Sequence, residues 1–161
     1  MGANVLTQSV EFNKEQIESS FKRLHPHANF IAERIVYYPY YYFCYNVKAK
    51  RLFLPLNEKV GCAIDSISGK GSLIDYKPKW KAIEISKEQQ MPEMYSLEDC
   101  TSISESFIYR SLSLKMRMIS FPELKREQQQ RFYRPYWVVW NERAESSDFI
   151  VDGVSGQFHP L

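Results

Sequence analysis

Apolar residues recur at helical spacing in two separate stretches of the chain. Over residues 13–24, Ile17, Phe21 and Leu24 fall on one face, and Asn13 with Gln16 forms a capping box at the start. Over residues 96–118 an apolar stripe follows Ser96, a good N-cap with Asp99 three positions later. We therefore predict helices over 13–24 and 96–118, and a third helix from Pro122 to about residue 131.

A second kind of pattern favours strands. Residues 30–47 are dense in aromatic and β-branched side chains on both faces, which is typical of a strand covered on two sides. We predict further strands over 59–65, 72–76, 134–142, 148–152 and 157–160, and a strand or sheet edge near residues 80–85.

The chain contains an internal repeat. Tyr38-Pro39-Tyr40 resembles Arg134-Pro135-Tyr136, and each copy leads to a frame of an apolar residue, Asp, a small residue, an apolar residue, Ser and Gly. In this frame the aspartate accepts backbone N–H groups two residues on, and the glycine takes the left-handed conformation. We therefore assign a structural role in two hairpin turns to Asp65, Gly69, Asp152 and Gly156.

These elements predict an α+β fold made of two related units, each a helix packed on antiparallel strands, which together form one globule. The predicted units are residues 1–95, with a connecting segment, and residues 96–161. The predicted core contains Ile17, Phe21, Ile35, Tyr41, Phe43, Ile64, Phe107, Trp137, Val139 and Val151.

The aromatic strand and the Asp-to-Gly hairpin resemble parts of PepSY-type and cystatin-like modules, here in tandem. The similarity covers residues 30–76 and 134–160 and rests on short motifs. It implies an α+β layer fold used for binding or regulation, with no catalytic constellation. Such modules are usually exported, whereas this sequence starts without a secretory signal, and its residues 96–131 exceed what one module needs.

Composition narrows the function classes. The 161 residues carry a net charge of +2, three cysteines and no run of 18 apolar residues, so we expect a cytosolic protein without a membrane span or a disulfide framework. His25, His27 and the cysteines lack the spacing of a zinc site, so we interpret the histidines as part of a polar loop. We predict no metal, no cofactor and no catalytic residue.

The leading hypothesis is a non-enzymatic binding module whose partner is another protein or a second copy in a homodimer, with no membrane role. An exposed part of the aromatic strand would offer the pairing edge, and this version fails if residues 37–45 are covered within one subunit. The alternative is a single-stranded nucleic-acid binding protein with interleaved rings and bases. Its candidate binding residues are Tyr76, Lys79, Trp80, Lys81, Tyr133 and Arg134.

Overall fold

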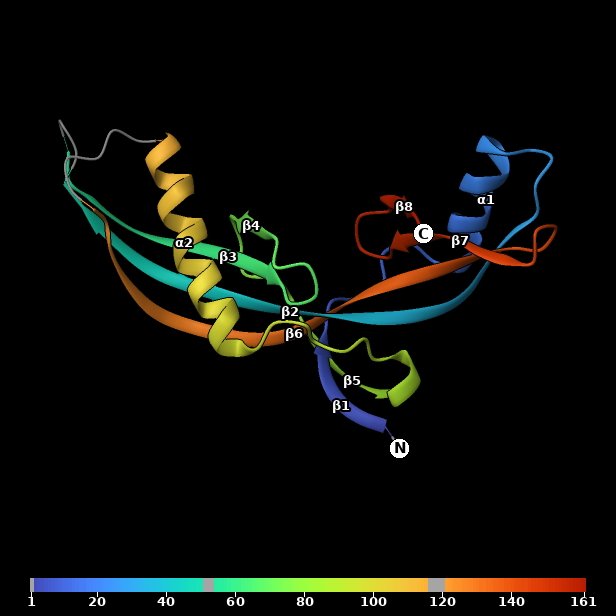
Figure 1. Ribbon diagram of the computed structural model, residues 1–161, viewed down its shortest axis with the longest axis horizontal. Helices are drawn as coiled ribbons and strands as arrows, with labels where there is room; N and C mark the ends of the chain where they lie inside the picture. Colours follow the sequence, from blue (N-terminus) through green and yellow to red (C-terminus); the bar gives the residue numbers. More distant parts are fainter. Residues whose placement is uncertain (1, 51–53, 116–120) are drawn as a thin grey trace. The chain divides into compact units, whose positions relative to one another are not determined.

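The computed structural model describes residues 2–50, 54–115 and 121–161 (Figure 1). Its elements are β1 (Gly2–Thr7), α1 (Lys14–Leu24), β2 (Phe30–Ala49), β3 (Leu56–Asp65), β4 (Gly71–Ile74), β5 (Lys81–Ser86), the 3-10 helix η1 (Lys87–Gln89), α2 (Leu97–Lys115), β6 (Glu123–Asn141), β7 (Ser146–Asp152) and β8 (Phe158–Pro160).

The predicted fold class, two related α+β units of a helix on antiparallel strands forming one globule, is wrong. Half of the chain is strand and 21% is helix. The strands form one mixed sheet in the order β4-β3-β2-β6-β1-β5, with β7 on β6 and β8 on β7. The contact of β1 with β6, Thr7 with Tyr133, is parallel, and so is an isolated bridge between Tyr37 and Gln90. The error arose because periodicity identifies an element but does not show which strands it packs against.

The elements recur along the chain in the same order. Strand, helix and three strands (β1, α1, β2, β3, β4) are followed by strand, helix and three strands (β5, α2, β6, β7, β8), with η1 inserted after β5. Both helices start with a capping pair, Asn13 with Gln16 and Ser96 with Asp99, in which each side chain accepts the other residue's backbone N–H. We call residues 2–74 the first half and residues 81–160 the second half.

The described residues form two compact units, and each unit takes segments from both halves. The terminal unit comprises residues 2–38, 79–91 and 133–161, and the middle unit comprises residues 39–78 and 92–132. The long strands β2 and β6 each contribute one part to the terminal unit and the other part to the middle unit. The compact units therefore do not follow the predicted ranges 1–95 and 96–161.

In the middle unit, α2 lies across β3 and β4 (Figure 1). Alternate residues of β2 point to this side, as expected for a pleated strand. The buried cluster comprises Tyr41, Phe43, Tyr45, Val47, Ala49, Leu56, Cys62, Ile64, Cys100, Ile108 and Leu112. The first half thus supplies the strands of this core, and the second half supplies its helix.

In the terminal unit the contributions are reversed. Ile17 and Phe21 on α1 pack with Ala32 of the first half and with Val139 and Val151 of the second half. Phe21 also contacts the rings of Phe30, Phe149 and Phe158 at centroid distances of 5.1–5.4 Å. Here the helix comes from the first half, and the β6–β7–β8 strands come from the second.

Most of the predicted core is confirmed. The buried members are Ile17, Phe21, Tyr41, Phe43, Ile64, Val139 and Val151. The other three, Ile35, Phe107 and Trp137, are half-buried and pack against the buried clusters. The predicted helices near 13–24 and 96–118 are confirmed within the described range, and residues 116–118 lie outside it.

The predicted helix from Pro122 to about residue 131 is wrong, because β6 starts at Glu123 and runs to Asn141. The segment is rich in Glu, Lys, Arg and Gln, which favour helices intrinsically. In the structure it instead lies beside β2 in the sheet. Tertiary pairing therefore outweighs the local propensity of this stretch.

The two Asp-to-Gly turns make the same contacts. Asp65 Oδ1 accepts the N–H of Ile67 at 2.8 Å, and Asp152 Oδ1 accepts that of Val154 at 2.8 Å. Each aspartate also accepts a longer bond of 3.3 Å from the next residue. Gly69 and Gly156 have φ of +76° and +78°, a left-handed conformation that glycine adopts without steric cost. These are Asx turns closed by glycine.

Candidate functional site

The six predicted binding residues are divided between the two units. Tyr76 is 86% exposed and belongs to the middle unit. Lys79, Trp80 and Lys81 belong to the terminal unit, where both lysines are exposed and Trp80 is half-buried. Tyr133 and Arg134 also belong to the terminal unit but have structural contacts there.

Tyr133 is 3% exposed, and its hydroxyl accepts a bond of 2.7 Å from the Gln90 amide. The Arg134 guanidinium donates to Asp152 Oδ2 at 2.8 Å and to Gln8 at 3.2 Å. These two side chains therefore hold the turn and the β1 contact in place. A surface for base stacking would have to rely on Tyr76, Lys79, Trp80 and Lys81, which stays a prediction.

The aromatic strand is part of the protein interior. Tyr37, Tyr41, Tyr42, Phe43 and Tyr45 are all at most 9% exposed. The two remaining tyrosines are half-buried: Tyr38 contacts the Tyr136 ring and Tyr40 contacts the Phe132 ring. Since β2 lies between β3 and β6 in the sheet, this strand offers no pairing edge along residues 40–49.

A buried tyrosine of the middle unit, Tyr41, is bonded to a half-buried carboxylate that also pairs with an arginine. The Tyr41 hydroxyl donates to the Glu93 carboxylate at 2.6 Å, and Arg131 forms an ion pair with the same carboxylate at 3.0 Å. Burial and this carboxylate raise the pKa of Tyr41. Glu93 thus joins Tyr41 and Arg131 in one cluster, and these bonds give all three side chains a structural role.

The thiols of Cys62 and Cys100 are not activated. Burial raises the pKa of Cys62 to about 12, and burial together with the Glu93 carboxylate raises that of Cys100 to about 11. A reactive thiol needs a lowered pKa and solvent access. Within residues 2–50, 54–115 and 121–161, no three His, Cys, Asp or Glu side chains are grouped so as to hold a metal ion. No helix of this described range is long and apolar enough to cross a bilayer.

None of the six candidate binding residues lines any of three cavities of the described residues. One of about 570 Å³ lies in the terminal unit between His25, His27 and Arg143. Another, of about 410 Å³, lies in the middle unit beside Tyr42, Cys44 and Asp75. A third, of about 370 Å³, lies along α1 beside Glu15 and Lys22. Asp65 and Asp152 line none of these three cavities, which agrees with their bonding inside the turns.

The feature that sequence reasoning missed is the open edge of β6 in the middle unit. Residues 123–130 are exposed except Leu124, which is half-buried. β6 pairs with β2 on one side, with β7 only at residues 136–141, and with β1 only at Tyr133. Within the described chain, no strand pairs with the outer side of residues 123–130. We call this stretch the β6 edge.

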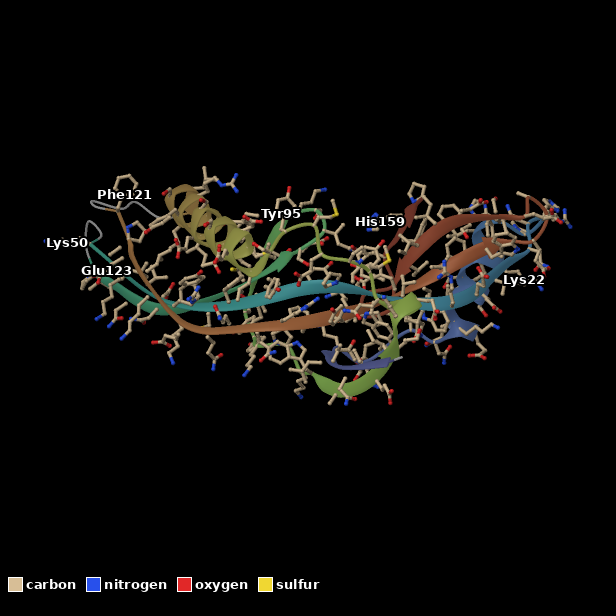
Figure 2. The ribbon with its side chains drawn as sticks, turned by 60° about the horizontal axis from the view of Figure 1, so that its bottom comes forward. Lys22, Lys50, Tyr95, Phe121, Glu123 and His159 are labelled. Atoms are coloured by element: carbon tan, nitrogen blue, oxygen red, sulfur yellow. The ribbon has the colours of Figure 1, made fainter. Side chains whose placement is uncertain are left out.

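Side-chain contacts hold the β6 edge from both faces of the sheet. On one face, Glu127 forms an ion pair with Lys59 of β3 at 3.3 Å. On the other, Arg126 donates to the Thr101 hydroxyl of α2 at 3.3 Å. Figure 2 shows Glu123, at the start of the edge, near Lys50 at one end of the middle unit. The edge is thus a fixed strand with exposed backbone, rather than a loose segment.

The repeat contained the signal that could have revealed this strand. Pro39 aligns with Pro135, and the residues before Pro39 belong to the strand predicted over residues 30–47. The equivalent residues before Pro135 are the β6 edge, so the repeat predicts a strand there although the local composition favours a helix. Comparison with protein-family models, curated proteins and solved structures finds no match to this chain.

Proposed function

We propose that this chain is a non-enzymatic protein-binding module that adds an extended segment of a partner protein to the β6 edge. The observation that carries the proposal is the eight-residue stretch 123–130, exposed except at Leu124 and without a strand on its outer side in the described chain. The predicted pairing edge on the aromatic strand is replaced by this one, because the aromatic strand is covered.

The backbone supplies the binding energy in this mode. In an antiparallel pair, alternate residues direct both N–H and C=O toward the same neighbour. A stretch of this length therefore directs roughly four donor–acceptor pairs away from β2. A partner strand satisfies these groups with main-chain hydrogen bonds, and side-chain pockets or charges then set the specificity.

The edge is organised before a partner arrives. Glu127 is held by Lys59, and Arg126 is held by Thr101, so the strand is tied to β3 and α2. Just beyond the edge, Arg131 is held by Glu93. Fixing the strand in its bound conformation reduces the ordering cost that binding would otherwise carry.

Charge on the edge favours a particular partner. Lys125 and Arg126 are adjacent and exposed, and Gln128, Gln129 and Gln130 follow as neutral hydrogen-bonding side chains. Opposite charges facing each other across strands stabilise the pair. We therefore propose a polar, extended partner segment with a carboxylate opposite Lys125 or Arg126. The same polar residues disfavour indiscriminate edge-to-edge aggregation.

A cytosolic setting is part of the proposal. Cys44, Cys62 and Cys100 are free thiols, and Cys62 and Cys100 are buried. Unpaired cysteines are the usual state in a reducing compartment. Mass spectrometry of the purified native protein after brief alkylation tests this, because we expect three unoxidised cysteines.

A selection from a library of extended decapeptides, followed by anisotropy titration of the enriched peptides, tests the binding mode. We expect enriched peptides to carry Asp or Glu and to lose at least tenfold in affinity for the Lys125→Glu variant. Lys14→Glu is the matched control, because Lys14 is an exposed lysine on α1 in the other unit. Equal affinity for both variants would contradict the proposed site.

Proline substitutions separate strand addition from simple charge attraction. Of Gln128 and Gln129, adjacent residues of one strand, one directs its N–H toward β2 and the other directs it outward. We expect one proline variant to unfold at a clearly lower temperature and the other to keep its melting temperature. The stable variant should lose peptide binding, and retained binding by that variant would exclude main-chain pairing.

A further inference from the structure

The two halves of the chain, residues 2–74 and 81–160, contact each other reciprocally. The carbonyl of Ser66, in the turn of the first half, accepts the N–H groups of Met94 and Tyr95 in the second half, both at 2.9 Å. The carbonyl of Gly153, in the turn of the second half, accepts those of Glu11 and Phe12 in the first half at 2.8 and 3.0 Å. In both directions, two successive N–H groups of one half therefore donate to one turn carbonyl of the other half.

The packing around these bonds is reciprocal too. A Cβ at Gly69 would meet the Tyr95 ring at 3.2 Å, and a Cβ at Gly156 would meet the Phe12 ring at 3.0 Å. Each ring stands directly before the N-cap of the helix that follows it, Ser96 or Asn13. The turn of one half is thus closed by the helix start of the other half, in both directions.

Both cores are shared between the halves. In the terminal unit, Ile17 and Phe21 of the first half pack with Val139 and Val151 of the second. In the middle unit, Phe43 and Ile64 of the first half pack with Ile108 and Leu112 of the second. Neither half can bury its helix or its strands without the other, because each unit draws on both.

The first strands of the halves complete the pattern. β1 pairs antiparallel with β5 from Gly2 opposite Ser86 to Thr7 opposite Lys81. An element that pairs with its own counterpart, together with contacts exchanged in both directions, is the property of an isologous two-fold interface. This chain contains such an interface within one molecule.

We infer that the two halves recognise each other as complementary partners, and that a second copy of this chain can supply either half. The covalent connection is short: only residues 75–80 join β4 to β5, and Tyr76 within them is 86% exposed. None of the reciprocal contacts above uses this connection. In an exchanged dimer, the first half of each chain pairs with the second half of the other chain, so each unit makes the same bonds as in the monomer. The monomer is still favoured, because the covalent connection gives its two halves a high effective concentration.

Complementation between two damaged full-length chains tests the inference. Phe21→Asp damages the first half, and Val151→Asp damages the second half, and both side chains belong to the core of the terminal unit. Each variant alone should lose that core. When the two variants are refolded together, exchanged dimers should form. In these dimers the undamaged first half of the Val151→Asp chain pairs with the undamaged second half of the Phe21→Asp chain, and this pair should regain the native emission of Trp137 and Trp140.

The matched control uses two variants damaged in the same half, Ile17→Asp and Phe21→Asp. Exchange between these chains cannot assemble an undamaged pair, so their mixture should give only the sum of the separate signals. If the Phe21→Asp and Val151→Asp mixture also gives only that sum, the inference is overturned. Variants of the β6 edge such as Lys125→Glu should exchange normally, which separates this result from the proposed binding function.

A second experiment does not depend on damaged cores. A sequence-specific protease site is inserted between Tyr76 and Lys77 in the otherwise unchanged chain, and the purified protein is cut. We expect native mass spectrometry to show both halves in one particle that dissociates only in denaturant. Cut protein labelled with ¹⁵N and unlabelled cut protein are then mixed, unfolded and refolded together. We expect particles in which one half is labelled and the other is not. Halves that separate in native buffer would overturn the inference.

Discussion

The two Asp-to-Gly turns make the same backbone hydrogen bonds but differ in the side chains around them. Asp152 is 7% exposed, and its Oδ2 is ion-paired with Arg134 at 2.8 Å. At the position equivalent to Arg134, the first copy has Tyr38, whose ring contacts the Tyr136 ring instead. The turn geometry is set by local backbone bonds, so both copies retain it. The surrounding side chains are not required by the turn and have diverged.

The two units also differ in how their buried groups titrate. Burial raises the pKa values of Tyr42 and Tyr45 to about 12, and that of Cys62 to about 12, and all three lie in the middle unit. In the terminal unit, burial raises the pKa of Tyr37. The three tryptophans, Trp80, Trp137 and Trp140, all lie in the terminal unit. A fluorescence signal therefore reports on one unit, and alkali acts mainly on the other.

The largest expected effect follows from this contrast. A group whose pKa is raised by folding stabilises the protein fully at pH values below its pKa in the unfolded chain, which is 10.0 for the phenols and 9.0 for the thiol. This stabilisation is lost as the pH rises toward 12, the pKa in the folded protein. Between pH 8 and pH 11 we expect the middle unit to lose on the order of 4 kcal/mol. Urea titrations at several pH values, followed by far-UV circular dichroism and by tryptophan fluorescence, measure it.

The two signals should coincide at pH 8 and separate at pH 11, with the helix signal of α2 lost before the tryptophan signal. Tyr45→Phe is the control, because it removes one buried phenol and should reduce the alkaline loss. Coincident transitions at every pH would show that the units do not differ in alkaline sensitivity.

The ion pair at the second turn gives the next largest effect. Arg134→Ala should destabilise the protein by about 2 kcal/mol, because it leaves the buried Asp152 carboxylate without its cation. The double variant Arg134→Ala with Asp152→Asn should recover part of this loss, since Asn retains an acceptor for the turn. Thermal and urea unfolding of the four proteins in the cycle measure the coupling. If Arg134→Ala lowered the stability equally with and without Asp152→Asn, the loss would not come from the Arg134–Asp152 ion pair.

These comparisons also show what the sequence could reveal. Local signals predicted local structure: the capping pairs of α1 and α2 and the strand over residues 30–47 have clear residue patterns. The pairing between the halves has no such pattern. Nothing in the spacing of Ile17 and Phe21 shows that they pack with Val151, more than a hundred residues away, as well as with Ala32 on the strand that follows them.

The β6 edge was hidden for a different reason. Its exposed residues carry no apolar alternation, because neither face of residues 125–130 is buried. Without burial, the period-2 pattern that identifies a strand is absent, and Glu, Lys, Arg and Gln then favour a helix on propensity alone. The partner of Arg134 was hidden as well: beside aromatic residues it suggests a nucleic-acid surface, and no local pattern shows its ion pair with Asp152.

A smaller effect concerns the two turn glycines. Gly69→Ala and Gly156→Ala should each cost about 1–2 kcal/mol, because both positions have a left-handed φ that a Cβ disfavours. The loss should be somewhat larger at Gly156, where the added Cβ meets the Phe12 ring at 3.0 Å rather than the Tyr95 ring at 3.2 Å. The asparagine variants are the controls, since Asn tolerates this conformation better. Equal stability of Ala and Asn variants would contradict a conformational cause.

The smallest expected effect exchanges the residue that directly follows the aspartate, which is serine in the first turn and glycine in the second. Ser66 is buried, and its hydroxyl donates to the Pro39 carbonyl at 2.8 Å. Gly153 occupies the equivalent position, where a Cβ would lie 3.0 Å from the Pro135 carbonyl oxygen. Ser66→Gly should cost about 1 kcal/mol through the lost hydrogen bond.

Gly153→Ser should stay within about 0.5 kcal/mol of the native protein, because the new hydroxyl can donate to Pro135 as Ser66 does to Pro39. Gly153→Val adds bulk without a donor and should cost about 1–3 kcal/mol. Urea unfolding of the three variants ranks them. If Gly153→Ser lowered the stability as much as Gly153→Val, the second turn would have no room for a side chain at this position. The two turns would then make the same backbone hydrogen bonds but differ in how closely their surroundings pack.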